Sequence, residues 1–500
     1  NTVVGESALD GSVTGDYNTV VGKYGGTNLT TGAYNTVLGY NSLADATTAS
    51  NNTAVGNLAL KANTADNNTA VGKDALTANT SGYRNVAVGT RAAKTVTTGN
   101  SNVAIGYECL EFTTTGSQNV AVGHQALEAN TTADANIAIG NAAMVSNTTG
   151  NNNVAIGQQA LDANTTGSQS IAIGNQALGS QNADVKNIAV GYRALQALTG
   201  GDGNVGMGRD VLYYLTTGSS NTAIGNDALG SITTADNNTA VGKSALGSNT
   251  SAKNNAFGVR ALTANTSGQQ NNAFGYQAMD ANTTGSYNTA FGDSSLGANT
   301  TADNNTAVGY YALVSNTTGY ENVAVGSESL DTNTTGHTNT GVGYKALESN
   351  NANGNTACGA YALYSNTTGT ENTAVGKSAL GANIGGNYNC AFGREALRLN
   401  STGNENCAYG YEALEANTTG GGNIAIGYEA LAANTTGSNN IALGHSALMT
   451  QSGDTQNTAI GVEALKVCIG SKNVALGYRA GYDVTTGHEQ TLIGYSAGAN

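Results

Sequence analysis

The chain has 500 residues, of which 69 are glycine, none is proline and only 10% are charged, with a net charge of −14. Because Lys and Arg are not clustered, binding to nucleic acid or to an anionic membrane surface is not expected, and no apolar stretch is long enough for a membrane span. The five cysteines are too few for a disulfide framework and do not have the spacing of metal ligands.

A block of the form Asn-small-Ala-aliphatic-Gly returns thirty times, at intervals of seventeen or sixteen residues. We number the slots of each repeat from the first residue of this block, so that the first repeat begins at Asn1 and the last at Gln490. A repeat this short cannot bury a core alone and must stack on its neighbours. Residues 1–500 are therefore predicted to be a single continuous β-solenoid array of about thirty 17-residue repeats. Since neither end carries a capping repeat, we expect a window of a longer chain.

Slots 1 to 5 come first in each repeat, and they hold no charged residue in any copy. This pattern predicts a buried short strand that ends at Gly. We expect the large apolar side chain of slot 4 to point into the coil and the Ala of slot 3 to point outward, against another copy of the chain. The Asn side chains of slot 1 are predicted to form a ladder. The slot 5 glycines, such as Gly106, Gly157, Gly174 and Gly427, are expected to form corners through a positive φ or close backbone approach.

The remaining slots return the chain to the start of the next strand. Slot 9, usually Leu, is expected to lie inside the coil on a second short strand. Slots 12 to 15, typically Asn-Thr-Thr-Gly, predict a surface turn, and the sixteen-residue repeats lose their residue there. Carboxylates recur in slots 7 and 10, as in Glu108 and Glu111. Because they are scattered over many repeats, we interpret them as solvated charges and not as a catalytic pair.

Two features of the repeat suggest covalent modification. The Asn-Thr-Thr and Asn-Thr-Ser turns are formal N-glycosylation acceptors, and they include Asn79, Asn130, Asn147, Asn164, Asn282, Asn316 and Asn434. Cys390 and Cys407 occupy the same slot of consecutive repeats, which places them near disulfide range if the repeats stack as neighbouring strands. The alternatives are that Asn and Thr only satisfy the turn, and that the two cysteines are small buried residues.

Several blocks resemble a known family. These are Asn-Val-Ala-Ile-Gly at 102–106 and 153–157, Ser-Ile-Ala-Ile-Gly at 170–174 and Asn-Ile-Ala-Ile-Gly at 423–427. They resemble the head repeats of YadA-like trimeric autotransporter adhesins, and similar arrays occur in proteins that look like phage tail fibres. The resemblance covers essentially the whole chain and implies an all-β, left-handed parallel β-roll in a side-by-side homotrimer, with the Ala face toward the trimer. This repeat is longer than the usual head repeat, and residues 1–500 show no heptad stalk, neck or membrane anchor.

These observations favour a structural function over an enzymatic one, because no residue is distinguished from its equivalents in other repeats. We expect the shaft of an extracellular fibre, which could be a cell-surface appendage, an adhesin or a virion's tail fibre, whose partners are other copies of the chain. The alternative is a multivalent adhesin whose outer Asn-Thr-Thr-Gly turns bind a surface glycan, matrix protein or host receptor. We predict no catalytic residue, no cofactor and no metal ligand.

Overall fold

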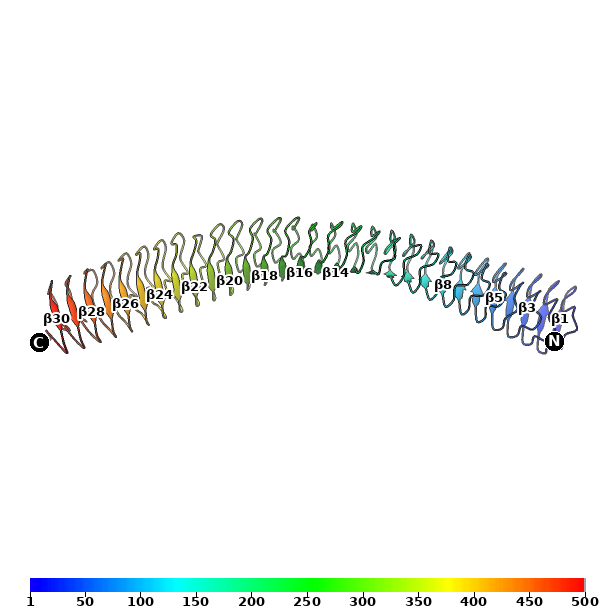
Figure 1. The fold of residues 1–500 in the computed structure, drawn as a ribbon, viewed down its shortest axis with the longest axis horizontal. Coiled ribbons are helices and arrows are strands. Elements are labelled where there is room, and N and C mark those ends of the chain that lie inside the picture. Colours follow the sequence, from blue (N-terminus) through cyan, green and yellow to red (C-terminus); the bar gives the residue numbers. More distant parts are fainter. Residues whose placement is uncertain (499–500) are drawn as a thin grey trace. The chain divides into compact units, whose positions relative to one another are not determined.

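The computed structural model describes residues 1–498, in which each repeat contributes one turn of a parallel β-solenoid. The described residues form strands and turns, with no helix among them. The chain divides into two compact units, the first ending at Ala252 and the second beginning at Lys253. Within each unit the strands follow one another in chain order (Figure 1). The all-β parallel solenoid predicted from the repeat is thus confirmed.

Every strand has three residues and occupies slots 2 to 4 of its repeat. The strands of the first unit are β1 (Thr2–Val4), β2 (Thr19–Val21), β3 (Thr36–Leu38), β4 (Thr53–Val55), β5 (Thr69–Val71), β6 (Val86–Val88), β7 (Val103–Ile105), β8 (Val120–Val122), β9 (Ile137–Ile139), β10 (Val154–Ile156), β11 (Ile171–Ile173), β12 (Ile188–Val190), β13 (Val205–Met207), β14 (Thr222–Ile224) and β15 (Thr239–Val241). Those of the second unit are β16 (Asn255–Phe257), β17 (Asn272–Phe274), β18 (Thr289–Phe291), β19 (Thr306–Val308), β20 (Val323–Val325), β21 (Thr340–Val342), β22 (Thr356–Cys358), β23 (Thr373–Val375), β24 (Cys390–Phe392), β25 (Cys407–Tyr409), β26 (Ile424–Ile426), β27 (Ile441–Leu443), β28 (Thr458–Ile460), β29 (Val474–Leu476) and β30 (Thr491–Ile493).

Consecutive strands pair in parallel, with each slot beside the same slot of the next turn. In β10 and β11, for example, Val154 lies beside Ile171 and Ile156 beside Ile173. The amide of Val154 donates to the carbonyl of Ser170 at 2.9 Å, and the amide of Gly174 donates to the carbonyl of Ile156 at 2.7 Å. Because the register is always one repeat, residues of one slot form continuous rows along each unit.

The interior of each turn is filled by slots 3, 8 and 9, as in the fully buried Ala155, Ala160 and Leu161. The predicted orientation of the strand is therefore wrong: Ala of slot 3 points inward and the large residue of slot 4 points outward. Side chains alternate between the two faces of a strand, so an inward slot 3 places slots 2 and 4 outside. The interior is tightly filled at Gly206 (slot 3), where a Cβ would lie 2.6 Å from Leu195 Cδ1.

The slot 5 glycines form the predicted corners. Gly157 has a φ of +136°, and a Cβ there would lie 2.5 Å from the carbonyl oxygen of Gly174. Gly106, Gly174 and Gly427 have φ values of +143°, +137° and +136°. Both of the expected reasons for Gly, the positive φ and the close backbone approach, therefore apply at the same position.

The returning segment is not the second strand that we expected. In the repeat beginning at Asn153, Gln159 (slot 7) and Leu161 (slot 9) have φ values of 54° and 53°, in the left-handed region. Gln159 donates its amide to Asn141 on the preceding turn at 3.0 Å, whereas Leu161 donates to Ala177 on the following turn at 2.9 Å. The alternating handedness breaks the extended conformation but keeps the peptide groups hydrogen-bonded to the turns on both sides.

The predicted Asn ladder of slot 1 is confirmed. The buried Asn136 accepts the amide of Asn153 on its Oδ1 at 2.9 Å, and Asn153 Nδ2 donates to the carbonyl of Gly167 at 2.8 Å. The same contacts recur in most turns, so each Asn side chain accepts the slot 1 amide of the next turn and donates to the slot 15 carbonyl of its own turn. These bonds fix the axial register that the outward rows share.

Candidate functional site

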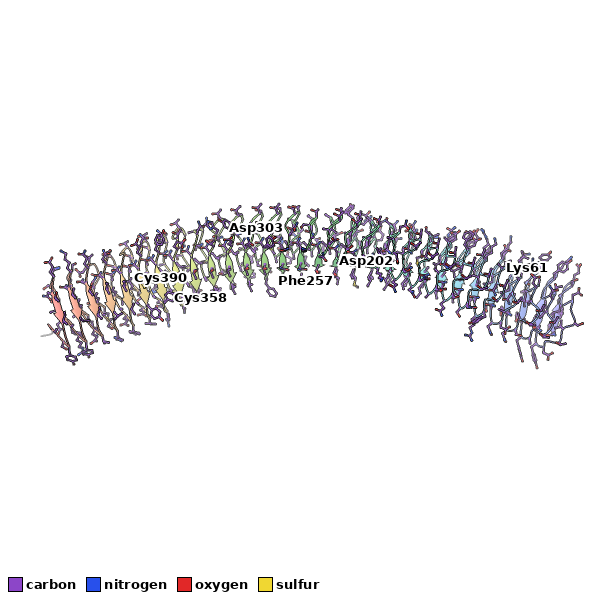
Figure 2. The ribbon with its side chains drawn as sticks, viewed as in Figure 1. Lys61, Asp202, Phe257, Asp303, Cys358 and Cys390 are labelled. Carbon is purple, nitrogen blue, oxygen red and sulfur yellow. The ribbon has the colours of Figure 1, made fainter. Side chains whose placement is uncertain are left out.

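The outer face of the strands carries continuous rows of apolar side chains. Ile105, Phe291 and Tyr409, all in slot 4, are exposed by 40%, 58% and 60%. Other exposed members of the slot 4 row include Leu38, Ile139, Ile173 and Met207 in the first unit and Phe257, Phe392, Ile426, Leu443 and Leu476 in the second. Figure 2 shows Phe257 on the strand side of the second unit and Asp303 on the opposite side. The strand face of each unit is thus an apolar stripe without charge.

Neighbours within the slot 4 row stack on one another because the register is one repeat. The rings of Phe257 and Phe274 are 4.7 Å apart and nearly parallel, and Phe274 and Phe291 are 5.8 Å apart. Stacking covers the ring faces within the row and leaves the ring edges exposed. A partner would therefore meet a ridged apolar surface and not separate aromatic platforms.

A second row, in slot 6, borders the apolar stripe and is rich in Tyr. Tyr411 and Tyr428 stack with ring centroids 5.3 Å apart, and Tyr428 and His445 stack at 5.0 Å. The guanidinium of Arg394, on the preceding turn, lies 5.6 Å from the Tyr411 ring centroid. This row adds polar edges to the apolar stripe, an arrangement typical of protein interfaces.

The glycosylation acceptors are not where the turn motif suggested. Asn79, Asn130, Asn147, Asn164, Asn282, Asn316 and Asn434 are all fully buried. Asn164 Nδ2, for example, donates to Asn147 Oδ1 at 2.9 Å and to the carbonyl of Gly167 at 3.0 Å. The predicted acceptor role is corrected: these side chains form a second interior Asn ladder, which the folded chain does not offer to a modifying enzyme.

The two cysteines are placed side by side but are not bonded. Cys390 and Cys407 are register partners on β24 and β25, as stacking required. Both thiols are free, half-buried and on the outer face. Burial, followed by the neighbouring Cys390, raises the pKa of the Cys407 thiol. The expected disulfide is therefore not formed in this structure.

The carboxylates of slots 7 and 10 also differ from our interpretation. Glu111 is only 1% exposed and Glu108 8%, so this pair is not a solvated decoration. Both carboxylates form ion pairs with Arg91 of the preceding turn. The sequence carries a signal for this pairing, because the basic Arg91 and the acidic Glu108 occupy slot 7 of neighbouring repeats. Residues of one slot touch along the stack.

Comparison with known proteins leaves the chain without an assigned family. No family model matches it, and no curated protein matches it. Among the described residues, no helix has the length and apolar character needed to cross a membrane.

Proposed function

We propose that this chain is the structural shaft of an extracellular fibre, in which copies of the chain pack side by side through the apolar stripes of their strand faces. The observation that carries the proposal is the uninterrupted outward row of slot 4. A soluble monomer rarely exposes a long contiguous apolar surface, and such surfaces mark contacts with other molecules. The extracellular setting rests on the resemblance of the repeat to adhesin heads and tail fibres.

The partner that best fits the stripe is another copy of the same chain. Along each row, the side chains recur once per solenoid turn. Only a partner whose side chains have the same spacing can fit between them along the whole row. Slots 1 to 5 are uncharged in every repeat, so two such faces can meet without burying a charge. We propose a trimer because three copies around one axis close the assembly and cover every stripe, in keeping with the resemblance to trimeric adhesins.

The reversed strand orientation changes which residues mediate this assembly. The Ala of slot 3, which we expected at the trimer contact, lies in the interior of each turn. The contact that we propose uses the larger residues of slots 2 and 4 instead. Their burial would contribute about 25 cal/mol per Å² of apolar surface removed from water.

The outer turns have less to offer a ligand than their sequence suggests. Asn of slot 12 is interior, and Thr131 (slot 13) donates its hydroxyl to the carbonyl of Thr148 at 3.0 Å. The slot 14 Thr, such as Thr132, is exposed. A shaft therefore has stronger support than an adhesin that binds through these turns.

The assembly can be tested by measuring the molar mass of the chain in solution by light scattering. We expect three times the mass of one chain. In the double variant Ile105→Lys and Ile139→Lys, charges on the stripe should dissociate the complex into folded monomers. The control Thr115→Lys and Thr149→Lys places the same charges on exposed turns of the same two repeats and should remain trimeric. A folded wild-type chain that is monomeric at micromolar concentration would refute the proposal.

A further inference from the structure

Three carboxylates gather in the first unit at one place on the returning segments. Glu108 and Glu111 occupy slots 7 and 10 of one turn, and Glu128 occupies slot 10 of the next. One oxygen of each lies within 4.8 Å of the others. Glu111 and Glu108 are buried and Glu128 is half-buried. We call these three residues the Glu triad.

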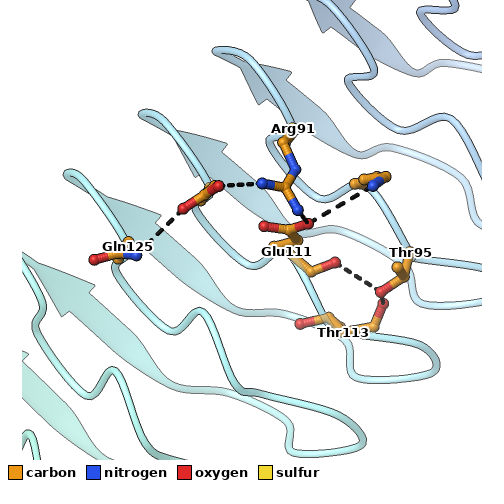
Figure 3. A network of polar contacts seen from close by, with 7 residues as sticks. Arg91, Thr95, Glu111, Thr113 and Gln125 are labelled. Atoms are coloured by element: carbon orange, nitrogen blue, oxygen red, sulfur yellow. Dashed lines mark hydrogen bonds and ion pairs between the residues drawn. The ribbon is translucent and has the colours of Figure 1, made fainter.

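Arg91 and Lys94, on the preceding turn, form ion pairs with two members of the Glu triad (Figure 3). Arg91 pairs with Glu108 through Nη1 and with Glu111 Oε1 through Nη2, the latter at 2.5 Å, and Lys94 Nζ lies 3.8 Å from the same Oε1. On the following turn, Gln125 Nε2 donates to Glu108 Oε2 at 3.2 Å. These contacts satisfy both oxygens of Glu108 but a single oxygen of Glu111.

The second oxygen of Glu111 is a buried acceptor without a partner. Oε2 has no hydrogen bond and is removed from solvent. Figure 3 shows Glu111 beside Arg91, with Gln125 on the following turn, which is also the turn of Glu128. Leaving a charged oxygen buried and unpaired is unfavourable. Three carboxylates against Arg91 and Lys94 leave one excess negative charge at the same place.

We propose that the Glu triad binds a calcium ion. Ca²⁺ takes carboxylate oxygens at about 2.3–2.6 Å, so two ligands of one ion stand up to about twice that distance apart. The three oxygens lie within 4.8 Å of one another, so each pair is within the span of a single ion. We place the ion at Glu111 Oε2, because Oε1 is already paired with Arg91 and Lys94, and water completes its shell.

Glu128 brings a carboxylate without a basic partner to the site. None of the ion pairs of the described residues includes it.

The chain contains two arrangements against which the Glu triad can be compared. Glu328, Asp331 and Glu348 occupy the same three slots in the second unit, but all are partly exposed and none has a buried unpartnered oxygen. Glu412 and Glu415 occupy slots 7 and 10 of another turn. On the turn that follows, Ala432 stands in slot 10, where the Glu triad has Glu128. Glu348 and Glu412 therefore provide matched control positions. The calcium site lies in slots 7 and 10, whereas the proposed contact between chains uses slots 2 and 4. The two proposals are therefore independent.

The experiment is a calcium titration of the full chain by calorimetry, with Tb³⁺ luminescence as a second readout because Tyr107, beside Glu108, can sensitise it. We expect Glu128→Gln to lower the Ca²⁺ affinity of one site at least tenfold, with an unchanged circular dichroism spectrum. Glu348→Gln and Glu412→Gln should leave that site unchanged. Glu128 is the main test because it forms no ion pair, whereas Glu111→Gln could unfold the turn.

Three results would overturn the proposal. They are the absence of any Ca²⁺-displaceable Tb³⁺ signal in the folded wild-type chain, a site that survives Glu128→Gln at full affinity, and equal weakening by Glu348→Gln. Binding of Mg²⁺ without a response to Ca²⁺ would equally contradict the assignment of the ion.

Discussion

In some turns, a change of side-chain size in slot 3 is matched by an opposite change in slot 8 or 9, which agrees with slot 3 pointing inward. Where slot 3 holds Val20 in place of Ala, slots 8 and 9 hold Gly25 and Gly26, and a Cβ at Gly25 would lie 2.9 Å from Val20 Cγ1. Conversely, Gly206 in slot 3 is matched by Val211 in slot 8. Large and small residues exchange places because slots 3, 8 and 9 share one small interior.

These exchanges make a prediction about substitutions in β10. Ala155→Leu should overpack the interior and lower the free energy of unfolding by about 1–3 kcal/mol. Val154→Thr, on the outer face of the same strand, should have little effect, since Thr already occupies slot 2 in many repeats. Thermal and urea unfolding followed by circular dichroism would compare the two. If Val154→Thr were the more damaging variant, the inward assignment of slot 3 would be incorrect.

The cysteines offer a second test at the scale of single residues. Burial raises the pKa of the Cys109 thiol to about 12, so this group is a neutral, inaccessible thiol at pH 8 and should react with a disulfide reagent only after unfolding. Cys358 is exposed in the single chain but occupies slot 4, on the proposed contact between chains, so it should react rapidly in the monomeric Ile105→Lys, Ile139→Lys variant and slowly in the trimer.

The measurement is the time course of thiol modification at pH 8, with and without denaturant. In that monomeric variant Cys358→Ser should remove one rapidly reacting thiol, whereas Cys109→Ser should change only the amount released on unfolding. Rapid modification of Cys109 in the folded chain would contradict its placement in the interior.

At the scale of the element, the short strand was predictable and the returning segment was not. The uncharged, length-invariant block gave slots 2 to 4 and the glycine corner. Nothing in the composition of slots 6 to 11 reveals left-handed residues such as Gln159 and Leu161, because Leu rarely adopts positive φ in isolation. The conformation is imposed by hydrogen bonds to the turns on both sides, which is tertiary information.

The glycine corner should be the most sensitive position of the turn. Gly157→Ala introduces a Cβ 2.5 Å from the Gly174 carbonyl oxygen at a φ of +136°, and we expect a loss of more than about 1–3 kcal/mol from backbone strain and steric clash. Gly200→Ala is the matched control, since a Cβ there meets no atom within 4 Å and its φ is not in the left-handed region.

Unfolding by heat and denaturant, compared between the two variants, tests this directly. Gly200→Ala should unfold like the wild-type chain, and Gly157→Ala at a clearly lower temperature. Equal stability of the two variants would show that the corner tolerates a side chain and that its glycine is not structurally required.

At the scale of the molecule, the period alone predicted the solenoid, but it could not orient the turn. A row of charge-free residues is equally consistent with an interior and with a covered exterior, and both occur here: slots 1 and 3 are buried inside the turn, while slots 2 and 4 form the outer stripe. The same limit applies to the Asn-Thr-Thr-Gly turns and to Glu108 and Glu111. We expected these polar side chains to be exposed to solvent. A buried ladder, however, satisfies the hydrogen bonds of polar groups as fully as water does.

A solenoid held together by rows of identical slots should accept the loss of a whole turn but not of part of one. Deletion of residues 153–169 removes one complete repeat and brings Asn136 and Ser170 into the relation that neighbouring first slots have elsewhere. Each backbone and Asn contact is then re-formed with an equivalent residue, and stability should fall only by the contribution of one repeat and one interface. Deletion of residues 153–161 instead joins slot 17 to slot 10, which omits a strand, a glycine corner and Leu161. Circular dichroism and limited proteolysis should show a native-like chain for the first deletion and cleavage near the junction for the second. Equal protease resistance of the two would mean that stacking in register is not what stabilises the fold.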